Sequence, residues 1–546
     1  MSRERRAVFA SVGLVAAVAV WVYWPALNNL FLHWDDLVYL KRAMVDRTFT
    51  LDRIRVVFTT TYFLNYHPLT TLSHALDCRL WGMNPAPHHA VNVLLHAVNV
   101  GLLTMLLWEL LAATRAFNAH EQLAVTVGVA LAFAVHPLQV ETVAWIAERK
   151  ALLCATFSLG CLYAYVKRAR TTTLVLFALA VLSKPTAAPL PAVMLLLDVY
   201  PLRRSAGVGW RRLVGEKLPL FAMSAIISSV AVWAQAAGHA TTTLERLGVA
   251  ARCLVASRGA VFYIWKLLWP VGLSPYYPLE GMITLRDREF SLSVASCVIV
   301  TVVAIWRRRK WPALVASWFA YLALIAPTSG LVQMGGQAVA DRYAYLAIVP
   351  VLLPIAWTIV WAWRRFTIVG QWVLLAAVAC TFAFWGFKTR AEIGVWHDDE
   401  TLWRAALAYF PRSVRVNGNV AMALARQGRM DAAEPFADFA VRANPEDPLY
   451  RTTRGLIYLT RHSYDEALAD FEVAVRSDPD MAVAHYDLAC VYSRLGRTSE
   501  ALAALREAVS RDAGFRRLAQ RDEDLANLRN DPRLAASVRE LFGKEP

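Results

Sequence analysis

Apolar runs of membrane-spanning length alternate with short basic clusters from the N-terminus to about residue 390. Because about 20 consecutive apolar residues cross the hydrocarbon core of a bilayer, this pattern predicts a polytopic membrane domain. Eleven spans are expected, at residues 7–27, 90–112, 122–138, 150–166, 172–183, 186–201, 217–236, 291–306, 311–326, 346–363 and 371–388.

The basic clusters all fall on one side of these spans. Arg3, Arg5 and Arg6 precede the first span, and later clusters lie at 167–170, 203–212, 307–310 and 364–365. The positive-inside rule predicts a cytoplasmic N-terminus, a retained first helix, and a long extracytoplasmic loop at 28–88. The segment 244–269 is apolar but carries Arg and Lys, and a further span there would put the cluster at 307 on the wrong side. We expect an interfacial or re-entrant helix on the outer face.

A repeat follows the last apolar run. Pro411, Pro445 and Pro479 recur every 34 residues, and small residues keep the same phase. This period predicts tetratricopeptide repeats at 414–447, 448–481 and 482–515, followed by a capping helix or two at 517–541. The predicted fold is all-α, with a membrane domain at 1–390 and an extracytoplasmic α-solenoid at 391–546.

Composition agrees with a membrane protein, since 57% of the 546 residues are hydrophobic and 20 are Trp. The net charge of +15 is unevenly divided, because the chain from Ala391 onward carries −4 and the membrane part +19. The positive charge therefore belongs to cytoplasmic loops, and no nucleic-acid partner is expected. The seven Cys show no CxxC pair, so neither a disulfide framework nor a zinc site is indicated.

Asp35 and Asp36 lie among aromatic and aliphatic residues at the predicted outer membrane boundary. A carboxylate that is partly desolvated there would have a raised pKa and could accept a proton from a sugar or Ser/Thr hydroxyl. Neighbouring residues cannot point at one atom, so at most one of the two is expected to be a base. The alternative is a helix cap or a salt bridge to Arg42.

Polar residues form a stripe on the second span, at His89, Asn92, His96 and Asn99. Such a stripe turns inward in lipid, where it borders a substrate cavity or hydrogen-bonds neighbouring helices. His89 and His96 are two turns apart, too far to share a metal ion.

Two further acids, Glu141 and Glu148, follow His136. Their spacing predicts that they share one helix face with Trp145. The alternative for these acids is an ion pair with Arg149 or Lys150. Cations on the predicted outer side could bind an anionic partner such as a lipid phosphate. Alternatively, they anchor the protein to lipid headgroups. They are Lys184, Arg252, Arg258, Lys266 and Arg342. Asp398 and Asp399 form a second acidic pair, which is expected only to cap the entry helix of the repeats.

Taken in order, these motifs resemble the transmembrane and tetratricopeptide-repeat O-mannosyltransferase family of GT-C glycosyltransferases over nearly the whole chain. The matching segments are 33–36 (HWDD), 67–73 (HPLTTLS), 80–85 with His89, Asn92 and His96, 136–141 (HPLQVE), 182–184 (LSK), 273–278 (LSPYYP) and 340–345 (ADRYAY). Pro185 and the small number of repeats depart from eukaryotic members and fit a bacterial-type member of the inner membrane.

The resemblance implies inverting transfer of mannose or a similar hexose from a polyprenyl- or dolichyl-phosphate donor to a hydroxyl, such as that of a protein Ser or Thr, on the extracytoplasmic side. It implies an acidic role for Asp35 or Asp36 and a cavity lined by His67, His89, Asn92, His96 and His136. Glu141 and Arg342 lie in matching motifs, and we infer a catalytic role for Glu141 and phosphate binding for Arg342, helped by Arg258, Arg252, Lys266 or Lys184.

The repeats are expected to hold a protein or glycan acceptor. No cofactor is assigned, and a requirement for a divalent cation stays open. The alternative is a membrane-anchored scaffold that assembles partner proteins without catalysis. A transporter ranks third, because it would place charges near mid-span, whereas most charges here lie at span ends.

Overall fold

The computed structural model describes residues 3–61, 65–237, 247–279, 281, 283–332 and 336–543. The chain forms two compact units, Met1–Thr401 and Leu402–Pro546. The predicted domain boundary at 390 falls inside a helix, because α18 (Ile368–Val395) continues through the polar residues that follow its apolar part.

The first unit is almost entirely helical, as predicted. Its longer helices are α1 (Arg3–Tyr23), α2 (Asp36–Asp46), α3 (Leu51–Thr59), α4 (Pro68–Trp81), α5 (Pro85–Thr114), α6 (Ala119–Val135), α8 (Arg149–Val166), α9 (Arg170–Ser183), α10 (Leu190–Val199), α13 (Leu218–Ala237), α14 (Val249–Leu268), α15 (Arg288–Trp306), α16 (Pro312–Ile325), α17 (Ile348–Trp363) and α18. Its short elements are η1 (Trp24–Asn28), η2 (Pro137–Gln139), α7 (Val140–Ala144), η3 (Ile146–Glu148), η4 (Pro185–Ala187), α11 (Ser205–Val208), α12 (Trp210–Gly215), η5 (Ala326–Thr328) and η6 (Asp341–Ala344). Strands β1 (Tyr277–Pro278) and β2 (Gln337–Val339) pair antiparallel.

Every one of the eleven predicted spans contains a helix. Among the described residues, five helices are long and apolar enough to cross a membrane, and a bent pair at 119–144 would make a sixth. The five are Arg6–Asn28, Pro85–Thr114, Leu218–Ala236, Arg288–Trp306 and Ile368–Val395. The chain is therefore an integral membrane protein, with several shorter apolar helices between these. The predicted interfacial helix corresponds to α14, although residues 244–246 lie outside the described residues.

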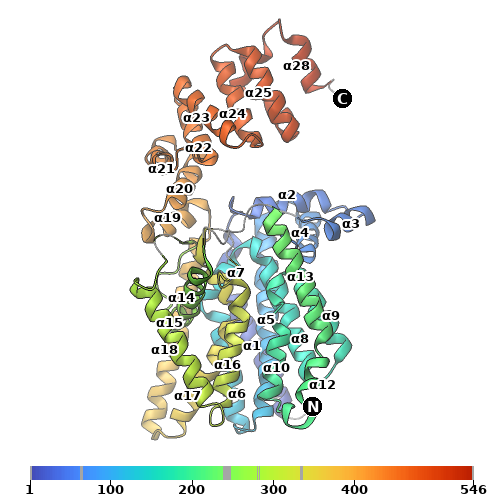
Figure 1. Ribbon diagram of the computed structural model, residues 1–546, viewed down its shortest axis with the longest axis vertical. Helices are drawn as coiled ribbons and strands as arrows, with labels where there is room; N and C mark the ends of the chain where they lie inside the picture. Colours follow the sequence, from blue (N-terminus) through green and yellow to red (C-terminus); the bar gives the residue numbers. More distant parts are fainter. Residues whose placement is uncertain are drawn as a thin grey trace. The chain divides into compact units, whose positions relative to one another are not determined.

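Helix α5 lies at the centre of the first unit, where it packs against α1, α6 and α8 (Figure 1). Its start is fixed by Asn84, whose side chain accepts a hydrogen bond from the Ala86 N–H at 3.2 Å. Its 30 residues correspond to about 45 Å, long enough to link both ends of the bundle. Gly101 permits the close approach of α1, because a Cβ at this position would lie 3.2 Å from Val12.

Two of the predicted basic turns lie near the C-terminal end of α5. Arg364, in the turn between α17 and α18, pairs with Glu121 at 2.6 Å, and Lys167 pairs with Glu109 at 2.5 Å. The N-terminal end of α5 instead lies beside α4 and the turn formed by η2, α7 and η3. Helices α2 and α3 lie across this end of the bundle (Figure 1). The turns at 364 and 167 therefore lie at the end of the bundle opposite to the turn formed by η2, α7 and η3.

The second unit is a tetratricopeptide array, as predicted. After α19 (Asp399–Tyr409), the three repeats are the helix pairs α20 (Val414–Arg426) with α21 (Met430–Ala443), α22 (Pro448–Thr460) with α23 (Tyr464–Ser477), and α24 (Ala482–Arg494) with α25 (Thr498–Arg511). The predicted capping helix at 517–541 is wrong in detail, because four short pieces replace it. They are α26 (Gly514–Ala519), η7 (Glu523–Leu525), α27 (Ala526–Arg529) and α28 (Ala535–Phe542).

Candidate active site

Asp36 begins α2 and is 0% exposed. Its two carboxylate oxygens accept hydrogen bonds from the backbone N–H groups of Leu32 at 2.9 Å and Ala147 at 2.8 Å. Burial raises the pKa of Asp36 to about 7. Asp36 therefore fastens the loop before α2 to the turn at η3, and neither oxygen is presented to solvent. Arg42, the alternative ion-pair partner, donates to Asp46 at 2.8 Å.

Asp35 differs from its neighbour because it stays partly exposed. It lies within electrostatic reach of Lys150 and Tyr39. The two adjacent carboxylates thus have different surroundings, and only Asp35 combines solvent access with a nearby cation.

Glu148 is the centre of a cation cluster at the same end of the bundle. Its carboxylate lies 2.8 Å from Lys184 Nζ, 3.1 Å from Lys150 Nζ and 3.5 Å from Arg342 Nε. Although burial acts to raise the pKa of Glu148, the three cations together hold it below its ordinary range. We call Glu148, Lys150, Lys184 and Arg342 the Glu148 cluster. A buried carboxylate with three cations is fully charged and rigidly held.

Glu141 joins this cluster through Arg342. The Arg342 backbone N–H donates to Glu141 Oε2 at 2.7 Å, and its guanidinium pairs with the other oxygen. Three cations thus face two carboxylates, which leaves a formal charge of about +1 before Asp35 is counted. The turn η2–α7–η3 supplies both glutamates, and η6 supplies Arg342.

Aromatic rings form one wall of the site. Trp145 stacks on Trp34 with ring centroids 4.8 Å apart, and Arg342 and Lys150 lie 5.4 and 5.6 Å from the Trp145 ring. Lys150 also lies 4.9 Å from the Tyr39 ring. The indole N–H of Trp145 is buried and has no hydrogen-bond acceptor within the described parts of the chain.

The structure brings together only some of the residues predicted from sequence. Asp35, Asp36, Glu141, Lys184 and Arg342 gather around η3, as the contacts above show. Glu148, Lys150 and Trp145 complete the group. The sequence pattern already indicates Glu148 and Trp145, and the alternative of an ion pair with Lys150 describes Glu148, whose carboxylate lies 3.1 Å from Lys150 Nζ.

The other predicted cations have hydrogen-bond and ion-pair partners outside the Glu148 cluster. Arg252 donates to the carbonyls of Leu247 and Leu331 at 2.9 and 3.0 Å. Arg258 pairs with Glu289 at 2.5 Å on the surface, and Lys266 donates to the carbonyl of Val271 at 2.6 Å. These contacts fix α14 and the chain after it, so we correct the prediction that these three cations join Arg342. The sequence did not reveal which side chains would lie next to one another around the bundle.

The predicted cavity-lining stripe is largely structural. The Asn92 amide donates to the carbonyl of Trp145 at 3.0 Å. His96 Nδ1 lies 2.8 Å from the Tyr345 hydroxyl, and His136 Nε2 lies 3.0 Å from the carbonyl of Leu267. The alternative in which these side chains hydrogen-bond neighbouring segments therefore describes Asn92, His96 and His136.

The two remaining members of the predicted cavity have different surroundings. His89 is buried at the start of α5. His67 lines a small cavity of about 10 Å³ with Tyr39 and Arg42.

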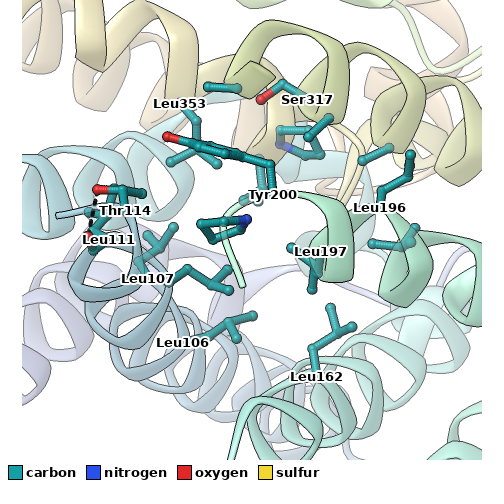
Figure 2. A pocket seen from close by; sticks show the side chains of 18 of the residues that line it. Leu106, Leu107, Leu111, Thr114, Leu162, Leu196, Leu197, Tyr200, Ser317 and Leu353 are labelled. Carbon is teal, nitrogen blue, oxygen red and sulfur yellow. Dashed lines mark hydrogen bonds between the residues drawn. The ribbon is translucent and has the colours of Figure 1, made fainter. Parts of the chain in front are cut away.

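One larger cavity adjoins the Glu148 cluster, and a second lies beside the first. The first, of about 50 Å³, is lined by Lys184, Arg342 and Tyr343 among other residues. An apolar cavity of about 140 Å³ lies between α5, α10, α16 and α17, and Figure 2 shows Leu106, Leu107, Leu196 and Leu197 on its wall. Both cavities share the same three lining residues, which are Leu190, Leu324 and Leu346. A pocket that contains two cations therefore shares part of its wall with an apolar cavity.

Comparison with known proteins gives matches to both units. The tetratricopeptide-repeat family model matches residues 400–448 and 452–515. The human "Protein O-mannosyl-transferase TMTC4" is 25% identical over 450 residues, which covers 68% of this chain and 56% of that protein. Human "Protein O-mannosyl-transferase TMTC1" is 24% identical and covers 67% of this chain and 46% of that protein.

Two further matches cover less of the chain. Mouse "Protein O-mannosyl-transferase TMTC2" is 38% identical over 108 residues, 20% of this chain and 12% of that protein. The match to the crystal structure of the MamA protein covers 26% of this chain and 75% of the MamA chain, at 18% identity and a TM-score of 0.23. The chain spans about half the length of the two relatives that match most of it.

Proposed function

We propose that this chain, a TMTC-like protein with a C-terminal tetratricopeptide-repeat domain, transfers mannose or a similar hexose from a polyprenyl-phosphate donor to a hydroxyl of a protein acceptor. The observation that carries this proposal is the adjacency of two cavities. A pocket lined by Lys184 and Arg342 shares three wall residues with an apolar cavity. A lipid-linked sugar phosphate has the matching chemistry, with one anionic group between a sugar and an isoprenoid chain.

The phosphate is expected to lie against Arg342 and Lys184. Arginine can offer two parallel N–H donors to a phosphodiester, and lysine adds a point charge. The cations of the Glu148 cluster would attract the single negative charge of the donor. The sugar would then extend toward Trp145 and Asp35, where ring faces and polar groups meet.

Asp35 is the base in this proposal. A base must reach the proton that it removes, and both oxygens of Asp36 are held by backbone N–H groups. The Asp36 pKa of about 7 would suit a base better than an ordinary carboxylate, but its inaccessibility decides against it. Asp36 therefore positions Asp35.

The reaction is a single displacement that inverts the anomeric carbon. Asp35 takes the proton of the acceptor hydroxyl as the oxygen bonds to the anomeric carbon. The bond from that carbon to the phosphate oxygen breaks, and the electron pair leaves with the lipid phosphate. Arg342 and Lys184 stabilise the charge that gathers on the departing phosphate.

Orientation follows from the distribution of charge. The basic turns at the C-terminal end of α5 would face the cytoplasm by the positive-inside rule. The Glu148 cluster and the repeats would then be extracytoplasmic. A nucleotide sugar does not cross the bilayer, so a lipid-borne donor is required on that side, and the repeats would hold the acceptor.

Transfer in membranes tests this proposal. Membranes that contain the full chain would be given labelled polyprenyl-phosphate mannose or labelled nucleotide-mannose. We expect incorporation into protein from the lipid donor only, with a loss of about 100-fold in Arg342→Ala. Arg308→Ala, in a basic turn where it donates to the carbonyl of Ile305, is the matched control. Equal transfer by wild type and Arg342→Ala would overturn the proposal.

The repeat family is the specific observation in favour of the scaffold alternative. If no lipid-linked sugar is transferred and the repeats still capture partner proteins from the same membranes, the scaffold alternative is correct.

A further inference from the structure

Three buried side chains with lone pairs converge where α4 meets the start of α5. They are His74, Asp77 and His88, and their ligand atoms all lie within 4.8 Å of one another. His74 and His88 are 0% exposed and Asp77 is 3% exposed. The spacing puts His74 and Asp77 on one face of α4, one turn apart. The proposed transfer reaction uses none of the three.

His88 is held in an orientation that suits a ligand. Its Nε2 lies 3.1 Å from the carbonyl oxygen of Gly82, which can only accept, so Nε2 carries the hydrogen. In the neutral ring Nδ1 is then a bare lone pair, and it faces Asp77 Oδ2 at 3.5 Å. Two acceptors that face each other inside a protein are unfavourable unless a proton or a metal ion lies between them.

His74 completes the group. Both of its ring nitrogens are buried and have no hydrogen-bond partner among the residues that the structure describes. A buried polar atom left without a partner costs about 1–3 kcal/mol. Core histidines therefore normally bond at least one nitrogen, as His96 and His136 do here, whereas His74 and His89 bond neither among the described residues. His74 thus lacks the partner that a bound ion would supply.

We propose that His74, Asp77 and His88 bind a divalent transition metal ion. Two imidazoles and one carboxylate are a ligand set of zinc, and they leave a fourth position for a water molecule. The outer contacts agree, because metal-bound histidines commonly donate their second N–H to a carbonyl and metal-bound carboxylates are commonly hydrogen-bonded. His88 donates to Gly82, and Asp77 accepts from Arg149 at 2.8 Å.

The charge of Arg149 opposes cation binding and has to be weighed. Its guanidinium is shared among Asp77, Ser73 at 3.0 Å and the carbonyl of His88 at 2.8 Å. A carboxylate offers about four lone-pair sites, so Asp77 can accept from Arg149 and bind a metal with another lone pair. The ion would link α4 to α5. It would also fix the chain around Asp35, because the rings of His88 and Phe31 lie 5.5 Å apart between centroids, and those of His74 and Tyr39 lie 6.2 Å apart.

Metal analysis of the purified full-length chain tests the proposal. The protein would be prepared in detergent without a polyhistidine tag, and its metal content measured by mass spectrometry. We expect about one zinc ion per chain, and less than about a tenth of that in His74→Ala and His88→Ala. Cobalt(II) loaded in place of zinc should give visible absorption bands in wild type and none in the variants.

The control is Cys490→Ser, in the other described group with metal-ligand potential, Cys490, Asp522 and Asp524. It should retain the metal. Size-exclusion chromatography checks that the His variants fold, and Asp77→Asn, which keeps the side-chain volume, replaces any that does not. A metal-free wild type that gives no cobalt spectrum overturns the proposal, as does metal that is retained in both His variants. Either result is independent of whether the chain transfers sugar.

Discussion

Glu148 shows how one buried carboxylate can organise a site from three helical segments. Lys150 lies in the first turn of α8, Lys184 lies between α9 and η4, and Arg342 lies in η6. Without Glu148 these buried cations would repel one another in a medium of low dielectric constant. The carboxylate therefore holds the phosphate-binding cations in place, and we assign it a positioning role.

Glu148→Gln should reduce sugar transfer about 100-fold or more, because the cations lose the charge that fixes their geometry. The initial rate with polyprenyl-phosphate mannose measures the effect. Glu289→Gln is the matched control, since Glu289 pairs with Arg258 at an exposed position and surface ion pairs contribute at most about 1 kcal/mol. Similar losses in both variants would contradict a special role for Glu148.

The pKa of Asp36 predicts a pH-dependent stability. Burial raises this pKa from 3.8 to about 7, so the folded chain binds the proton more tightly than the unfolded chain. Asp36 thus stabilises the fold below about pH 4 and loses this contribution as the pH rises through about 7. Relative to Asp36→Asn, wild type should lose about 2 to 3 kcal/mol between pH 5 and pH 8. Thermal unfolding at both pH values measures it, and a pH-independent difference would contradict it.

Which residues form the site could be predicted only in part. Asp35, Asp36, Glu141 and Arg342 stand out in the sequence because charges in apolar surroundings are costly. Arg252, Arg258 and Lys266 stand out equally, yet their contacts are with backbone carbonyls and Glu289. Hydropathy gives the end of the bundle at which a residue lies, whereas its neighbours depend on how the helices are arranged around the bundle.

At the scale of elements, the sequence predicts most of the fold. Apolar length gives the membrane helices, and the period of 34 residues gives the repeats. The predicted helix boundaries are wrong where local capping interactions determine where a helix ends. The last segment of the chain is divided because Asp522 accepts from the Asp524 N–H at 2.9 Å and Pro532 separates α27 from α28. Domain boundaries are missed for a related reason, since α18 stays helical beyond its apolar part.

Gly455 in α22 allows close packing within the second repeat. A Cβ there would lie 2.8 Å from the ring of Phe471 in α23. Gly455→Ala should therefore destabilise this repeat by about 1–3 kcal/mol. Hydrogen exchange of α22 and α23 in the full chain would detect it. Gly496→Asn, at a turn with φ +73, should change exchange little, because Asn tolerates that conformation. Unchanged exchange in Gly455→Ala would argue against this packing.

At the scale of the whole membrane unit, the apolar cavity is expected to hold the isoprenoid chain of the donor. Leu107→Trp, which fills the cavity (Figure 2), should raise KM for a long-chain donor about tenfold. A short-chain analogue should be affected much less. Leu292→Trp, on α15 where the side chain is 55% exposed, is the matched control. An equal change in KM for long-chain and short-chain donors would show that the isoprenoid chain binds outside this cavity.

The most direct test of the central claim compares two acidic pairs in one assay. Asp35 is proposed as the base, whereas Asp398 accepts from the Thr401 N–H at 2.8 Å and from the Thr401 hydroxyl at 3.0 Å. Transfer from labelled polyprenyl-phosphate mannose should fall about 100-fold or more in Asp35→Asn. It should fall less in Asp36→Asn, and stay near wild type in Asp398→Asn. Full transfer by Asp35→Asn would contradict the account.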